Sequence, residues 1–246
     1  MVVGGATWDG LADEARSGAW DVVAIHSNFL SKRGIGRFIQ AVRESSDAKI
    51  LVGGPGATEP EAFLEAGAHA VCVGEVEHRA TALIDGVCGR GDLADIPGIH
   101  YRDADGRARD TGPAPTIGDL DALPFPHRPE ELVPLYGEPV NPAQTGEYIS
   151  VMSARGCPFQ CAFCVSHEIW GKRVRTRSVD NVLDEIAQAL NDWPRAYIAF
   201  VDDIWGLSPS WAEEFCTKKW SAECVFHGCA FCIRSASARG AIVSCR

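Results

Sequence analysis

The sequence has no long apolar run and no excess of positive charge. No segment approaches the ~20 consecutive apolar residues that cross a bilayer. The opening Met-Val-Val-Gly-Gly-Ala also lacks the basic and apolar regions of a signal peptide. We therefore expect a cytoplasmic protein without a membrane segment. Acidic side chains outnumber basic ones by 33 to 23, and the net charge of −10 opposes binding to a nucleic-acid backbone.

The composition is that of a globular protein with an unusual number of cysteines. Hydrophobic residues make up 46% and charged residues 23% of the chain, which excludes disorder as the default. Ten cysteines are present. In a cytoplasmic chain of this length, clustered cysteines bind metal or perform redox chemistry more often than they form disulfides.

Residues 1–88 alternate short apolar runs with amphipathic stretches, which is typical of a parallel sheet covered by helices. The runs begin at Asp21, Lys49 and Ala70, and each ends in small or polar residues. We predict an incomplete Rossmann/flavodoxin-like α/β domain, with helices near 34–45 and 58–66. Ligands of such folds bind at the carboxyl ends of the strands.

The next two segments differ from each other in character. Residues 89–146 are rich in Gly, Pro and Asp, and the Asp-Gly in Asp103-Ala-Asp-Gly predicts a hairpin within a linker. Residues 147–246 show a second α/β pattern. Its expected elements are strands beginning at Tyr148 and Ala196 and helices at 178–191 and 209–220.

Three cysteines follow the strand at Tyr148 within eight residues, in Cys157-Pro-Phe-Gln-Cys161-Ala-Phe-Cys164. One short loop can therefore wrap its thiolates around a single metal cluster. An iron–sulfur cubane is normally held by four thiolates, so three leave one iron open to a small-molecule chelate. The open iron is a catalytic position.

This CxxxCxxC loop, with an aromatic residue before its last cysteine, resembles the signature of the radical SAM (S-adenosylmethionine) enzymes. The resemblance implies a [4Fe-4S] cluster on Cys157, Cys161 and Cys164, with SAM completing the open iron and Phe163 beside the adenine. It also implies reductive cleavage of SAM to a 5′-deoxyadenosyl radical, while the protein positions and shields the cofactors. The expected partners are a small-molecule substrate and an electron donor such as flavodoxin or ferredoxin.

Asp202 and Asp203 end the next strand, at the sheet edge where barrel enzymes build their sites. The resemblance implies that one of them contacts the amino group of SAM. The alternative is a structural role, as an N-cap for the loop and helix that begin at Ser208.

The first domain resembles the cobalamin-binding domain that precedes many radical SAM modules. The resemblance rests on the runs that begin at Asp21, Val52 and Val73. It implies a cobalamin site at the strand ends, formed by Ser27, Gly53, Gly54, Gly74 and Glu75. The sequence has no Asp-x-His-x-x-Gly, so we expect no histidine ligand to cobalt. His26 is more often a hydrogen-bonded structural residue at such a position.

The combined resemblance implies a cobalamin-dependent radical SAM enzyme, with methyl transfer to an unactivated centre as the leading reaction. It assigns no catalytic residue in this chain. One alternative is an inactive cobalamin-binding or scaffold fragment. The other is a zinc-stabilised α/β protein, in which Cys161 and Cys164 pair with the matching tetrapeptide at Cys229 and Cys232.

The length of the chain sets a further expectation. After Cys164 there is room for two or three βα units of ~30 residues each, so we expect only the N-terminal part of a radical SAM (β/α) barrel. The first domain likewise begins at its second strand. We expect the chain to be incomplete at both ends, and residues 217–246 to be a shifted or non-native stretch. The basic run from Lys172 to Arg177 predicts either an anion site or a solvated face.

Overall fold

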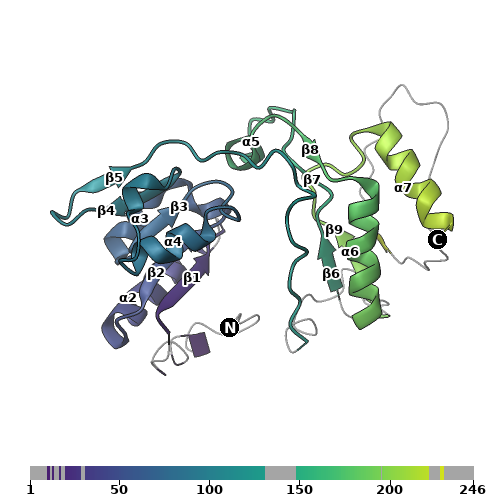
Figure 1. Cartoon of the computed structure of the whole chain (residues 1–246). Coiled ribbons are helices and arrows are strands. Elements are labelled where there is room, and N and C mark those ends of the chain that lie inside the picture. The colour runs from purple at the N-terminus through teal and green to yellow at the C-terminus, as the bar shows by residue number, and fades with distance from the viewer. Residues whose placement is uncertain are drawn as a thin grey trace. The chain divides into compact units, whose positions relative to one another are not determined.

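The computed structural model of this protein describes residues 10–11, 13, 17, 20–28, 31–130, 148–194, 196–221 and 228–229. The chain divides into two compact units, with the boundary between Ile117 and Gly118 (Figure 1). We call the described residues up to Ile117 the first unit and those from Gly118 onward the second unit.

The described strands of the first unit form a five-stranded sheet in the order β1-β2-β3-β4-β5. Strands β1, β2 and β3 pair in parallel, while β3/β4 and β4/β5 are antiparallel. The strand bounds are β1 Val22–His26, β2 Lys49–Gly53, β3 Ala70–Cys72, β4 Ile99–Arg102 and β5 Ala108–Asp110. The helices between them are α2 Lys32–Ser45, η1 Pro55–Thr58, α3 Pro60–Ala66, α4 Ala80–Val87 and η2 Leu93–Asp95.

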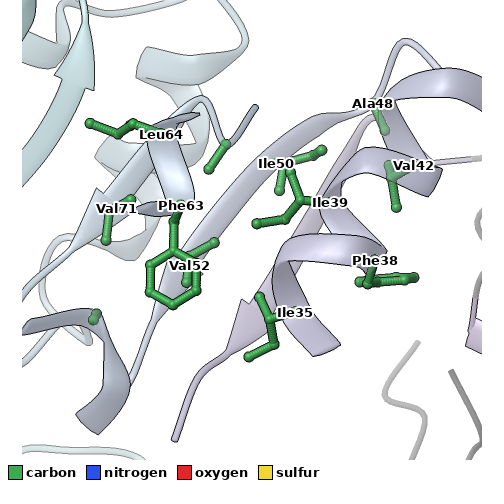
Figure 2. Close-up of a cluster of buried hydrophobic side chains, with 12 residues drawn as sticks. Ile35, Phe38, Ile39, Val42, Ala48, Ile50, Val52, Phe63, Leu64 and Val71 are labelled. Carbon is green, nitrogen blue, oxygen red and sulfur yellow. The ribbon is translucent and has the colours of Figure 1, made fainter. Parts of the chain in front are cut away.

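Alternating apolar residues explain why helices cover both faces of this sheet. Ile50 and Val52 of β2 point into one cluster, shared with α2 and α3 (Figure 2). Leu51 points into another, shared with α4. Helix α2 buries Ile35, Phe38, Ile39 and Val42, a spacing that places all four on one helical face.

The predicted hairpin is the β4/β5 pair, and it extends the sheet of the first unit. Tyr101 lies opposite Arg109 in its register. The turn is held by the Asp103 carboxylate, which accepts from the backbone N–H of Arg107 at 2.9 Å and pairs with Arg109 at 2.7 Å. The side chains of β5 are all exposed.

The described strands of the second unit form a parallel sheet in the order β10-β9-β6 and a separate β7/β8 pair. Helices α6 and α7 pack against the parallel sheet through Val182 and Ile186 of α6 and Phe215 of α7. The strands are β6 Tyr148–Val151, β7 Ala154–Arg155, β8 Arg175–Thr176, β9 Tyr197–Phe200 and β10 Gly228–Cys229. The helices are α5 Ser166–Trp170, α6 Val179–Asp192 and α7 Pro209–Ser221.

Helix α6 begins at a defined cap, because the Ser178 hydroxyl accepts from the backbone N–H of Asn181 at 3.2 Å. None of the helices in the described part of the chain is long and apolar enough to span a membrane.

Candidate functional site

The three cysteines lie on one loop of the second unit, residues 156–164, which we call the cysteine loop. It follows β6 and the short β7. Cys157 is buried, Cys161 is exposed and Cys164 is partly exposed, and none of the three is in a disulfide. The backbone N–H of Cys164 donates to the carbonyl of Cys161 at 3.0 Å, which closes a turn between these two residues.

An iron–sulfur cluster fits this loop because of the ligand atoms that the loop offers. Three thiols on a short loop match the ligands of an iron–sulfur cubane with one open iron. Across the described residues, no three Cys, His, Asp or Glu side chains converge closely enough to hold a metal ion. The structure therefore provides the ligands on one loop but does not bring their side chains together.

A glycine fixes the entry to the cysteine loop. Gly156 has φ +98°, and a Cβ at this position would lie 2.4 Å from the carbonyl oxygen of Arg173. Any other residue would be strained by the positive φ and would collide with the backbone next to β8. The residue before Cys157 is thus held close to the segment that follows α5.

Cys164 is connected by hydrogen bonds to the end of β9. Its thiol donates to the Ser166 hydroxyl at 3.3 Å, and that hydroxyl donates to the Asp203 carboxylate at 2.7 Å. After deprotonation the sulfur can instead accept from the hydroxyl and the backbone N–H of Ser166, which favours the thiolate and lowers the pKa of Cys164. Asp203 itself is exposed. A residue predicted to contact SAM therefore lies beside the last cysteine of the loop.

Asp202 has a different environment from Asp203. Its Oδ1 accepts from the backbone N–H groups of Ser153 and Ala154 at 2.6 and 2.8 Å, and its Oδ2 accepts from the Ser153 hydroxyl at 2.5 Å. Burial raises the pKa of this carboxyl, and these hydrogen bonds act in the opposite direction. The N-cap alternative is wrong for both aspartates, because the N–H of Trp211 donates to Ser208 at 3.4 Å.

The aromatic side chains of the cysteine loop are exposed. Phe163, predicted to lie beside adenine, is 90% exposed, and Phe159 is 52% exposed. No part of the second unit covers Phe163. An exposed phenyl ring next to a ligand loop offers an apolar surface for a planar ligand.

A buried ion-pair network lies under the end of β6. Glu185 of α6 is 1% exposed and pairs with Arg128 and Arg177. Arg128 also donates to the carbonyl of Ser150 at 3.1 Å, and Arg177 to that of Met152 at 2.9 Å. Two arginines bound to one carboxylate thus hold the backbone of β6 just before the cysteine loop.

The expectations for the basic run were wrong for two of its members. Arg175 is buried and donates to the carbonyl of Trp170 at 3.0 Å, and Arg177 belongs to the network with Glu185. Lys172 and Arg173 are exposed. Lys172 and Arg173 precede the short strand β8, whereas Arg175 begins it and Arg177 follows it.

In the first unit, strand-end residues predicted to bind cobalamin lie at one sheet edge, since β1 to β3 are parallel. Ser27 follows β1, is fully buried, and its backbone N–H donates to the carbonyl of Gly53 at 2.7 Å. Gly54 has φ +90°, and a Cβ there would lie 2.7 Å from the His26 ring. At Gly53 a Cβ would make only ordinary contacts, at 3.9 Å from Cys72.

Gly74 and Glu75 contact the segment that follows the hairpin. Gly74 has φ +79°, and a Cβ there would lie 3.0 Å from the side chain of Ala114. The Glu75 carboxylate accepts from the backbone N–H of Ile117 at 3.3 Å. The chain itself therefore fills the space beside Gly74 and engages one oxygen of the Glu75 carboxylate.

Several residues that build these edges were not predicted as site residues. Gly56 packs against Ser27, so closely that a Cβ would lie 2.4 Å from the hydroxyl. Arg79 is buried and donates to the carbonyl of Glu75. Ser166 and Arg128 were also missed, because their partners are distant in sequence. The zinc alternative involves Cys232 and the side chain of Cys229, which lie outside the described residues.

The first unit has a sheet whose first three strands are parallel, and the second has a parallel sheet whose first strand leads into a three-cysteine loop. This arrangement resembles a cobalamin-binding domain followed by a radical SAM barrel. No protein-family model matches the chain.

Solved structures and curated proteins resemble the chain. The structure of the radical S-adenosylmethionine methyltransferase TsrM from Kitasatospora setae, with cobalamin and a [4Fe-4S] cluster bound, matches with a TM-score of 0.68. The match has 20% identity over 87% of this chain and 44% of that one. OxsB, a cobalamin-dependent S-adenosylmethionine radical enzyme solved with aqua-cobalamin, matches with a TM-score of 0.71 and 19% identity over 89% of this chain and 31% of OxsB.

The sequence relatives agree with the structural ones. An uncharacterized methyltransferase of Pyrococcus horikoshii is 33% identical over 56% of this chain and 29% of its own length. The cytidylyl-2-hydroxyethylphosphonate methyltransferase of Streptomyces wedmorensis is 28% identical over 50% of this chain and 28% of its own. The predicted fold class and the resemblance to cobalamin-dependent radical SAM proteins are confirmed. The chain spans under a third of the length of these two curated relatives.

Proposed function

We propose that this chain is part of a cobalamin-dependent radical SAM enzyme that transfers a methyl group to an unactivated centre of a small molecule. The observation that carries the proposal is the cysteine loop, with its three thiols outside any disulfide, placed after the first strand of a parallel sheet. The likeness to TsrM and OxsB supports it, as do relatives named as methyltransferases. We further propose a cytoplasmic location and an electron donor such as flavodoxin or ferredoxin.

In this proposal the second unit holds the cluster and SAM. Cys157, Cys161 and Cys164 would hold a [4Fe-4S] cluster, with Phe163 beside the adenine and Asp203 near the amino group of SAM. When bound, the cluster supplies the electron that cleaves SAM, and cobalamin carries the methyl group. The residues of the chain hold the loop in place: Gly156 fixes its entry, and Ser166 connects Cys164 to Asp203.

The first unit would bind cobalamin at the carboxyl edge of β1 to β3. Ser27, Gly53, Gly54, Gly74 and Glu75 remain the proposed residues of this site. Gly53 is the glycine with room for a ligand beside it, since a Cβ there meets nothing closer than 3.9 Å. Gly54 and Gly74 would act indirectly, by letting the loops pack closely enough to shape the edge.

Anaerobic reconstitution with iron and sulfide tests the proposed function. We expect a reduced-cluster EPR signal that changes when SAM is added and is lost in Cys157→Ser. Cys88→Ser is the matched control, because Cys88 is a partly exposed cysteine of the first unit outside any disulfide. A protein that takes up zinc and no iron would contradict the proposal and favour the zinc-stabilised alternative.

The transferred group needs its own measurement. With the cluster and cobalamin bound, we expect S-adenosylhomocysteine and a methylated product from candidate substrates. Formation of 5′-deoxyadenosine alone, across all candidates, would contradict methyl transfer while leaving the radical SAM assignment intact. Failure to cleave SAM despite a complete cluster would favour the scaffold alternative.

A further inference from the structure

The Asp202 carboxylate holds the two residues that follow β6. Backbone pairing between β6 and β9 extends past the strands to the N–H of Val201, which donates to the carbonyl of Val151 at 3.0 Å. One residue further on, the Asp202 side chain accepts from both backbone N–H groups of Ser153 and Ala154. The carboxylate thus continues the connection between the two strands where backbone pairing ends.

The groups that Asp202 binds are shielded from water. Ser153 is 2% exposed and Ala154 is 9% exposed. If the carboxylate were removed, their N–H groups would lose an acceptor that solvent cannot easily replace. The path of the backbone at these residues therefore depends on Asp202.

These residues lead directly into the cysteine loop. Only Arg155 and Gly156 separate Ala154 from Cys157. Gly156 is itself fixed against the carbonyl of Arg173. The approach to the first cysteine is therefore held at two points, by a side chain of the β9 end and by a close backbone contact.

Both oxygens of Asp202 are engaged within the protein, at 2.5 to 2.8 Å. Asp203, in contrast, is exposed and accepts from Ser166 beside Cys164. The two neighbouring aspartates thus face different surroundings, which separates their roles.

We propose that Asp202 is a positioning residue, which sets the path of the cysteine loop through Ser153 and Ala154 and makes no contact with SAM. The inference rests on the proposed function in so far as the loop holds a cluster. It assigns any SAM contact at this strand end to Asp203.

Two substitutions at one position separate positioning from ligand binding. In Asp202→Asn the amide oxygen keeps both backbone N–H groups, and the amide nitrogen can donate to the Ser153 hydroxyl, which accepts after rotation. Asp202→Asn therefore keeps the hydrogen bonds to Ser153 and Ala154 and loses only the negative charge. Asp202→Ala loses all three of these hydrogen bonds. Asp184→Ala, at an exposed aspartate of α6, is the matched control.

The first readout is iron content and EPR after anaerobic reconstitution of the full chain. We expect iron in Asp202→Ala to fall roughly tenfold, because two buried donors lose their acceptor. We expect Asp202→Asn and Asp184→Ala to match the wild type and keep the EPR change on SAM addition. If Asp202→Asn took up iron but its EPR signal did not change on SAM addition, Asp202 itself would contact SAM. If Asp202→Ala took up as much iron as the wild type, the positioning role of Asp202 would be refuted.

The second readout does not need a cluster. In the iron-free chain, amide hydrogen exchange at Ser153 and Ala154 should accelerate roughly tenfold in Asp202→Ala and stay unchanged in Asp202→Asn. Unchanged exchange across α6 would show that the second unit remains folded. If the wild type takes up no iron, the proposed function fails while this test still decides the positioning role, and equal exchange in all variants would overturn it.

Discussion

The carboxyl edges of the two parallel sheets are stabilised in different ways. In the first unit, glycines allow loops to pack within contact distance of one another, as at Gly54 beside His26. In the second unit, charged side chains hold the backbone from a distance, as Glu185 does through Arg128 and Arg177. Close glycine packing is the more frequent device at the first edge, and buried carboxylates are the more frequent one at the second, where Gly156 also contributes.

This difference bears on where a ligand can be held. At the first edge, Ala114 packs beside Gly74, and the N–H of Ile117 donates to one oxygen of Glu75. At the second edge, buried charges hold the backbone while Cys161 and Phe163 remain exposed. At the first edge Gly54 and Gly74, with positive φ, allow close packing within the chain, whereas at the second edge an exposed thiol lies on a loop whose entry is fixed.

The largest expected effect tests the charged edge. Glu185→Ala leaves Arg128 and Arg177 buried without their carboxylate, which should lower the free energy of unfolding of the second unit by ~3–5 kcal/mol. Urea denaturation followed by hydrogen exchange in α6 measures it. Asp180→Ala on the same helix removes an exposed pair with Lys218 and should cost under ~1 kcal/mol. Equal losses of unfolding free energy in Glu185→Ala and Asp180→Ala would contradict the special role of the buried carboxylate.

The glycine edge should respond to an added methyl group. Gly54→Ala places a Cβ against the His26 ring at φ +90°, and the strain should destabilise the first unit by ~1–3 kcal/mol. Gly53→Ala is the neighbouring control, because its Cβ would make only ordinary contacts and its φ is not positive, and it should change stability by less than ~1 kcal/mol. The measurement is the urea midpoint of the first unit in each variant, followed by amide hydrogen exchange in α2. An unchanged urea midpoint in Gly54→Ala would show that the loops at this edge are packed less closely than in the structure.

A smaller, local effect is expected where the first edge uses a charge. Glu75→Ala removes the acceptor for the N–H of Ile117, which should favour local opening of residues 112–117 by ~1–2 kcal/mol. Hydrogen exchange of a peptide that covers this segment measures it. Glu61→Ala, at an exposed position of α3, is the control. No change in the peptide would mean that Ala114 packing alone holds the segment.

The smallest expected effect is a pH dependence of the first unit. His69 accepts from the N–H of Ile50 at 2.9 Å, and burial, with Lys49 and Arg43 nearby, lowers its pKa from 6.5 to about 4. The unfolded state therefore binds a proton first as the pH falls, and stability present above pH 6.5 is lost between pH 6.5 and about 4. Partial exposure of the ring limits the loss to ~1 kcal/mol.

The measurement is the urea midpoint of the first unit at pH 7 and pH 5. His69→Asn keeps a side-chain oxygen that can accept from Ile50 and does not titrate. Its midpoint should change less with pH than that of the wild type. Identical pH profiles would assign the dependence to other groups.

Local patterns in the sequence predict most of the elements. The expected helix at 34–45 is α2 at Lys32–Ser45, and that at 178–191 is α6 at Val179–Asp192. Both helices have apolar residues on one face, and this pattern can be read from the sequence without knowledge of the fold. The Asp-Gly hairpin was likewise visible, because its turn chemistry is local.

The supporting contacts were not predictable in the same way. Glu185 and Arg128 are 57 residues apart, and Asp202 and Ser153 are 49 apart. Nothing in the spacing of charges along the chain indicates such pairs. Strands β7 and β8, with two residues each, were also missed, because a period of two cannot be read from so few positions.

The hairpin of the first unit has a consequence for association between molecules. Its outer strand β5 consists of Ala108, Arg109 and Asp110, with all side chains exposed. A short edge strand that carries both charges is a poor template for pairing with a strand of another copy. The antiparallel hairpin thus closes this side of the mixed sheet against intermolecular strand addition, and so protects the first unit from aggregation at that edge.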